Sequence, residues 1–176
     1  MGARSRRRGY RTEAAVVAWL RAHGWTHAER RAGNPGSDIV GVLPWSIEIK
    51  GHADPMISMR KGIPQAARQA ERDAAYPLTI IRIPGTTNVA HWWTAWPASD
   101  HLDREWPKPA ICQRRYEAIR STLDTNDCVS VADKAYTRII VATTAIWSRW
   151  AIEHDERRPD LGPTPTLPGE PQLDRG

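Results

Sequence analysis

The sequence predicts an α/β fold in which helices flank a mixed central sheet. Hydrophobic residues make up 40% and charged residues 26% of the 176 positions, a composition typical of a chain with a packed core. Between residues 10 and 96, segments of helical periodicity alternate with short runs rich in Val and Ile, which are typical of strands. Beyond residue 107 the apolar positions recur at helical spacing. We therefore expect an α-helical extension behind the sheet.

The first part of the chain divides into alternating elements. A helical pattern covers residues 10–23, where Val16, Val17 and Leu20 form one apolar stripe and Gly24 is a stop signal. The following segments are predicted as strands over 25–31, 38–43 and 45–50, a helix over 64–75 that opens at Pro64, and strands over 78–83 and 89–96. The predicted order is α-β-β-β-α-β-β.

The remainder of the chain has a different texture. Residues 111–123 and 130–156 are predicted to be helical, and Ser130 suits the N-cap of the second helix. From residue 159 onward five prolines in 18 residues indicate a disordered tail. The predicted organisation is a basic flexible arm over 1–8, a core domain over 9–106, a helical extension over 107–158 and a Pro-rich tail over 159–176.

Charge points to a polyanionic partner. The 25 Lys and Arg residues exceed the 20 Asp and Glu residues, for a net charge of +5. Residues 1–31 hold eight arginines against two acids, and such clusters favour nucleic acid because each phosphate contact releases counterions. A GC-rich coding bias explains Arg over Lys but not this clustering. No apolar run approaches the length of a membrane span, so a cytoplasmic protein without a membrane partner is expected.

Three charged residues of a predicted hairpin form the chemical centre. In a strand alternate side chains share a face, so Glu48 and Lys50 project together while Ile49 faces the core. Asp38, on the neighbouring strand, shares their face only if even positions pair with even positions, which requires an odd-length turn or a bulge. The expected turn is Leu43-Pro44-Trp45, and its Trp45 is expected to be exposed.

Two carboxylates and a lysine on one face suit metal-assisted phosphodiester hydrolysis. Asp38 and Glu48 offer oxygen ligands for Mg²⁺, the carbonyl of Ile49 offers another, and Lys50 would orient water or stabilise the phosphate. Solvated cross-strand ion pairs are the alternative, but the Ile- and Val-rich strands indicate a core hairpin. Glu13 lies on the apolar helical stripe, where it either joins these acids or only interacts favourably with the positive end of the helix dipole.

Along the chain come, in order, the helix with Glu13, then Arg30-Arg31, Gly36-Ser37-Asp38, Glu48-Ile49-Lys50 and a helix with Gln65. This ordered set resembles the PD-(D/E)XK nuclease superfamily, which has a restriction-endonuclease-like core. The likeness spans residues 9–96 and is nearest to archaeal-type Holliday junction resolvases and their phage counterparts. The resemblance implies that Glu13, Asp38 and Glu48 are metal-associated, that Lys50 is catalytic and that Gln65 positions water or phosphate. Ser37 stands where the family has a proline.

The resemblance implies a Mg²⁺-dependent endonuclease that cuts branched DNA, with Mn²⁺ able to substitute and no small-molecule cofactor. A homodimer is expected, because two symmetric cuts need two active sites. The residues expected to contact DNA are Arg6, Arg7, Arg8, Arg11, Arg30, Arg31, Ser37 and Arg60. The alternatives are a restriction or repair nuclease on the same core, acting on duplex, flap or single-stranded DNA, and a non-catalytic DNA-binding module.

Overall fold

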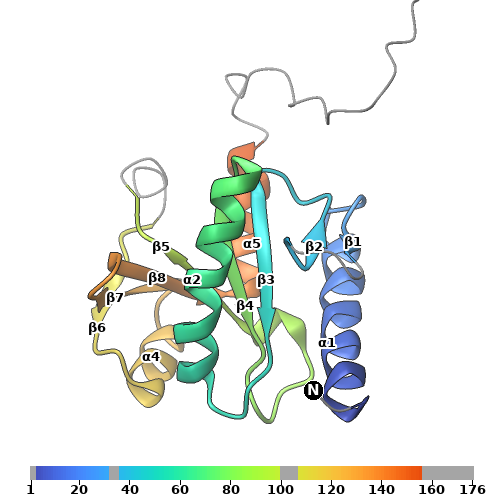
Figure 1. The fold of residues 1–176 in the computed structure, drawn as a ribbon. Helices are drawn as coiled ribbons and strands as arrows, with labels where there is room; N and C mark the ends of the chain where they lie inside the picture. The colour runs from blue at the N-terminus through green and yellow to red at the C-terminus, as the bar shows by residue number, and fades with distance from the viewer. Residues whose placement is uncertain (1–2, 32–35, 100–106, 156–176) are drawn as a thin grey trace, which may run out of the picture.

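One mixed sheet of eight strands runs through the computed structural model, which describes residues 3–31, 36–99 and 107–155 (Figure 1). The strand order across the sheet is β1-β2-β3-β4-β5-β8-β7-β6. The strands are β1 (Glu29–Arg30), β2 (Ile39–Val40), β3 (Trp45–Lys50), β4 (Tyr76–Ile81), β5 (Trp93–Pro97), β6 (Ala110–Cys112), β7 (Cys128–Asp133) and β8 (Thr137–Thr143). The helices are α1 (Ala3–Ala22), α2 (Pro55–Asp73), α4 (Tyr116–Leu123), α5 (Thr144–Asp155) and the short 3-10 helix η1 (Val89–His91). The predicted α/β class is confirmed.

The predicted order of elements over the first part of the chain is also confirmed. Helix α1 is followed by β1, β2 and β3, which pair antiparallel in sequence. Helix α2 then crosses over so that β4 lies parallel to β3, and β5 returns antiparallel to β4. The crossover places α2 over the strands that carry the acidic residues singled out above.

Helix α2 begins at Pro55, nine residues before the predicted start at Pro64. The Asp54 side chain caps it by accepting from the Met56 amide at 2.8 Å, and proline in the first turn costs no hydrogen bond. Pro64 lies inside the helix instead of opening it. Consequently Arg60, expected in a loop, is an exposed residue of α2.

The predicted helical extension over 107–158 is wrong, because most of it builds the other half of the sheet. β6, α4, β7 and β8 repeat the order of β3, α2, β4 and β5, and β5 pairs with β8 at the centre. Within β8, Ile139 and Val141 enter one core cluster, while Ile140 and Ala142 enter the other. A strand covered on both faces presents an unbroken apolar run, which also fits a helical period. Of the predicted second helix only α5 remains.

The ends of the chain differ from the prediction in a second way. Residues 3–8, expected as a flexible arm, form the first turns of α1. Ala and Arg are both good helix formers, so this extension conflicts with no local preference. The predicted tail over 159–176 lies outside the described residues.

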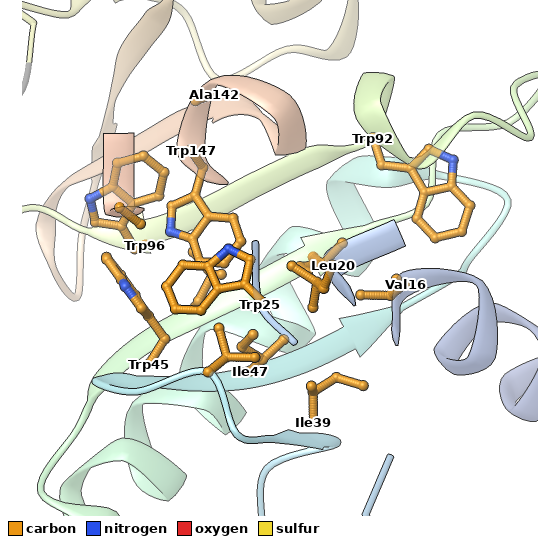
Figure 2. Packing of buried hydrophobic residues seen from close by; sticks show 14 of the residues in the cluster. Val16, Leu20, Trp25, Ile39, Trp45, Ile47, Trp92, Trp96, Ala142 and Trp147 are labelled. Atoms are coloured by element: carbon orange, nitrogen blue, oxygen red, sulfur yellow. The ribbon is translucent and has the colours of Figure 1, made fainter. Parts of the chain in front are cut away.

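Two hydrophobic clusters pack on opposite faces of the sheet. The first joins α1 and α5 to one face and is rich in tryptophan, as Figure 2 shows for Trp25, Trp45, Trp96 and Trp147. The second joins α2 and α4 to the other face. Trp45, predicted to be exposed, is only 6% exposed, and its ring lies edge-on to Trp147 at 5.6 Å. Within the described ranges, no helix is both long and apolar enough to cross a membrane.

Candidate active site

The hairpin register brings the two central carboxylates to one face. Ile39 of β2 pairs with Ile47 of β3, so Asp38 falls opposite Glu48, and the predicted pairing of even with even positions is confirmed. The Asp38 amide donates to the Ile47 carbonyl at 2.7 Å, and Asp38 Oδ2 accepts from the Ile49 amide at 2.7 Å. These two bonds hold the Asp38 carboxylate at the edge of β3.

Lys50 and Glu48 form an ion pair beneath helix α2. Glu48 is 2% exposed, and its Oε1 accepts a hydrogen bond from Lys50 Nζ. Lys50 Nζ also donates to Gln65 Oε1 at 2.8 Å. A buried carboxylate is costly unless it is paired and hydrogen-bonded, and Lys50 supplies the pairing here. Gln65 lies in the site as expected, where its direct contact is with the lysine.

Gln69 is a member of the site that the sequence interpretation missed. Its Nε2 donates to Glu48 Oε2 at 2.9 Å and to the Gly36 carbonyl at 2.7 Å. The amide thereby ties Glu48 to the loop that leads into Asp38. Its spacing of four from Gln65, which places both amides on one side of a helix, was the available signal.

A glycine lets helix α2 approach these residues closely. A Cβ atom on Gly62 would lie 2.3 Å from Thr79 Cγ2 and 3.0 Å from Lys50 Cγ. No side chain fits in that space, so the helix packs directly over the aliphatic part of Lys50. The lysine is thereby held between the strand and the helix, with its ammonium group directed to Glu48 and Gln65.

Asp38 has a strongly perturbed acidity. The pKa of Asp38 is raised to about 7, chiefly by burial, then by the neighbouring Glu48 carboxylate and to a smaller extent by the charge of Glu13. The Ile49 amide and the Lys50 charge lower this pKa, but by less. A neighbouring negative charge raises the pKa of a carboxyl group, so the raised pKa of Asp38 indicates that Lys50 does not fully neutralise the negative charge of the site. Such a site favours a bound cation.

Glu13 contributes to this field without joining the central pair. Its Oε2 accepts from Arg30 Nη1 at 3.1 Å, and the Arg30 guanidinium lies 4.4 Å from the centroid of the Tyr10 ring. Because α1 starts at Ala3 and has no acid in its first turn, the helix-dipole explanation for Glu13 is excluded. Arg30, expected to contact DNA, is instead engaged by these two side chains.

The donor set fits a magnesium ion that keeps part of its water shell. In the described part of the chain, no three His, Cys, Asp or Glu side chains are arranged as a complete metal cluster. Mg²⁺, however, needs only one or two carboxylates besides waters and phosphate oxygens. Asp38 and Glu48 supply these, and the Ile49 carbonyl lies on the same strand edge as the Ile49 amide that bonds Asp38. The predicted direct metal role of Glu13 is not favoured, because Arg30 holds it.

The predicted DNA contacts divide into four groups, the first of which is Arg30, bonded to Glu13 and stacked on Tyr10. Ser37 is only 5% exposed, and its hydroxyl bonds the Ile39 carbonyl at 2.6 Å and the Ile47 amide at 2.8 Å, so it bridges two strands and does not reach a ligand. These bonds engage the Ser37 hydroxyl within the protein, so the structure does not favour its predicted contact with DNA. The residues that are exposed, as that role requires, are Arg7, Arg11, Arg31 and Arg60. The structure does not describe the side chains of Arg6 and Arg8.

Comparison with known proteins adds no relatives. No protein-family model matches the chain, and neither a curated protein nor a solved structure shows significant similarity to it. The chemistry of this site must therefore be argued from its own residues.

Proposed function

We propose that this protein is a Mg²⁺-dependent DNA endonuclease with a restriction-endonuclease-like core. The observation that carries the proposal is the placement of Asp38 opposite Glu48, with Lys50 on the same face and bonded to Glu48. Two carboxylates and an ammonium group gathered between a sheet and a helix are costly for stability, and such groups cluster at functional sites.

The chain order of the elements supports the same proposal. The motifs on which the resemblance to PD-(D/E)XK nucleases rests follow one another on a helix, three antiparallel strands and a second helix, which leads to a strand parallel to β3. Each matching residue lies on, or directly before, the element expected for it. Glu13 lies on α1, Asp38 directly precedes β2, Glu48 and Lys50 lie on β3, and Gln65 lies on α2.

In the proposed reaction a water oxygen attacks the phosphorus, and the bond from phosphorus to one ester oxygen breaks. That oxygen leaves with a proton, so a phosphate monoester and a hydroxyl group are formed. Mg²⁺, when bound at Asp38 and Glu48, lowers the pKa of water and neutralises charge on the phosphate. Lys50 supplies a positive charge at the phosphate, and Gln65 keeps the ammonium group in place.

Branched DNA is the proposed substrate, and a homodimer is the proposed form of the enzyme. Both follow from the likeness to junction resolvases, and two symmetric cuts require two active sites. A second candidate, a non-catalytic DNA-binding module, is favoured by one observation. Both oxygens of Glu48 already accept hydrogen bonds, one from Lys50 and one from Gln69, so the carboxylate is satisfied without a metal ion.

Cleavage assays separate these candidates. Labelled four-way junction, duplex, flap and single-stranded DNA are incubated with Mg²⁺ and either the wild type or Lys50→Ala. Paired cuts in the junction alone support a resolvase. Cuts in duplex or flap DNA support a nuclease but refute the junction as its substrate. Lys50→Ala should abolish cleavage while junction binding persists. DNA binding without cleavage of any substrate would establish the binding module instead.

A further inference from the structure

An arginine-lined groove lies on the α1 side of the sheet, near the end of β3, and the candidate active site does not explain it. It is hollowed between the first half of α1 and the segment that joins β4 to β5, and its volume is about 490 Å³. This arginine groove is lined chiefly by Arg7, Arg11, Thr12, Arg82, Thr87 and Trp92.

The described residues leave the positive charge of the arginine groove without a compensating acid. Arg7 and Arg11 are four residues apart on α1, so their like charges repel each other across one turn. Arg82 adds a third positive charge, and its guanidinium lies 5.9 Å from the centroid of the Trp92 ring. Among the residues that the structure describes, no acidic side chain lines the groove, and none of the three arginines forms an ion pair. The groove is therefore built to receive an anion.

The arginine groove begins one residue beyond the proposed catalytic lysine. The Arg82 amide donates to the Lys50 carbonyl at 2.9 Å. A Cβ atom on Gly51 would lie 3.9 Å from Thr12 Oγ1 and 4.0 Å from Arg82 Cβ, so this position faces the groove on the α1 side of the sheet. Lys50 projects to the other side, beneath α2, where it bonds Gln65. The groove and the candidate active site therefore lie on opposite faces of the sheet and approach each other at the end of β3. In Figure 1 the start of α1 lies toward the same end of the molecule as the end of β3.

We propose that the arginine groove binds the sugar–phosphate backbone of one DNA strand where that strand passes the end of β3 toward the candidate active site. This inference rests on the proposed function. A volume of about 490 Å³ is typical of a site for a small ligand, so the groove accommodates a short length of a single strand. Thr87 offers a hydroxyl to phosphate, and the buried Trp92 forms an apolar floor. The groove thus selects a strand that has separated from its complement, as at a branch point.

The test measures binding separately from cleavage. Affinity for a fluorescent single-stranded oligonucleotide and for a four-way junction is measured by anisotropy in EDTA over a series of salt concentrations. Arg11→Gln and Arg82→Gln should each weaken binding several-fold and reduce the slope of log affinity against log salt by about 0.7, the value for one lost single-strand phosphate contact. Arg82→Lys keeps the charge and should retain most of that slope.

Arg72→Gln is the matched control. Arg72 is exposed near the far end of α2, outside the groove, and its replacement changes the net charge equally. An equal loss of slope in Arg72→Gln, or an unchanged slope in both groove variants, would overturn the groove as a strand site. DNA binding that depends on the groove, with no cleavage in Mg²⁺ or Mn²⁺, would uphold the groove and refute the nuclease. Normal cleavage by Arg82→Gln at an unchanged KM would uphold the nuclease and refute the groove as a strand site.

Discussion

Replacing Asp38 by Asn should stabilise the protein at neutral and higher pH in the absence of metal ions. Asn keeps an oxygen that accepts the Ile49 amide, which Asp38 Oδ2 accepts at 2.7 Å in the wild type. It removes the negative charge that lies opposite Glu48 and near Glu13. Groups that an active site needs for its chemistry commonly lower the stability of the folded protein, as two neighbouring carboxylates do here.

The magnitude follows from the acidity of Asp38. Burial and the Glu48 carboxylate raise its pKa from 3.8 to about 7, a change that corresponds to at most ~4 kcal/mol of stability. Asp38 remains partly exposed, and solvent screens part of the repulsion, so we expect a gain of about 1–2 kcal/mol.

The sign depends on pH. Between pH 3.8 and about 7 the folded protein holds a proton at Asp38 that the unfolded chain has lost, so this group makes the wild type less stable as pH rises through that window. The Asp38→Asn variant has no ionisable group at this position. Its advantage should be absent near pH 4 and complete above pH 7. Mg²⁺ should reduce the advantage, because the ion stabilises only the wild type appreciably.

Urea unfolding followed by tryptophan fluorescence measures this difference at pH 4.5 and pH 8, with and without Mg²⁺. Asp127→Asn is the control, because Asp127 is an exposed acid outside the site. A loss of stability in Asp38→Asn at pH 8, or a difference from the wild type that does not change with pH, would refute the account that burial and the Glu48 charge make ionised Asp38 destabilising.

Three further substitutions test how the site is held together. Gly62→Ala should lower the free energy of unfolding by about 1–3 kcal/mol, because the new Cβ meets Thr79 Cγ2 at 2.3 Å. Adding Thr79→Ser removes that methyl group and should restore much of the lost stability. No recovery in thermal melts would contradict the steric explanation. Ser37→Ala should cost about 1–3 kcal/mol in urea unfolding through an unpaired strand amide, and a neutral result would mean that water replaces the hydroxyl. Gln69→Ala should slow cleavage while DNA affinity is kept, because its amide bonds Glu48. Gln69→Glu should slow cleavage more at pH 8, because it places a like charge against Glu48. Equal rates for both variants would show that Gln69 does not position the carboxylate.

Local patterns determined much of the first half of the fold. The stripe of Val16, Val17 and Leu20 on α1 is buried as its spacing predicts, because a helix has one fixed period. The alternation in β3 likewise set Glu48 and Lys50 on one face, since a strand admits only two faces. These features depend on neighbours along the chain, and the sequence alone is enough to predict them.

Other features were decided only by tertiary structure. The run of buried residues from Ile139 to Ala142 forms a strand because the sheet is covered on both faces, a condition that no local period records. Gln69 and Arg82 acquire their roles from the placement of α2 and of the β4–β5 connection against β3. Residue types and their spacing define which chemistry is available, whereas long-range packing determines which charged groups meet and which of them remain without a partner.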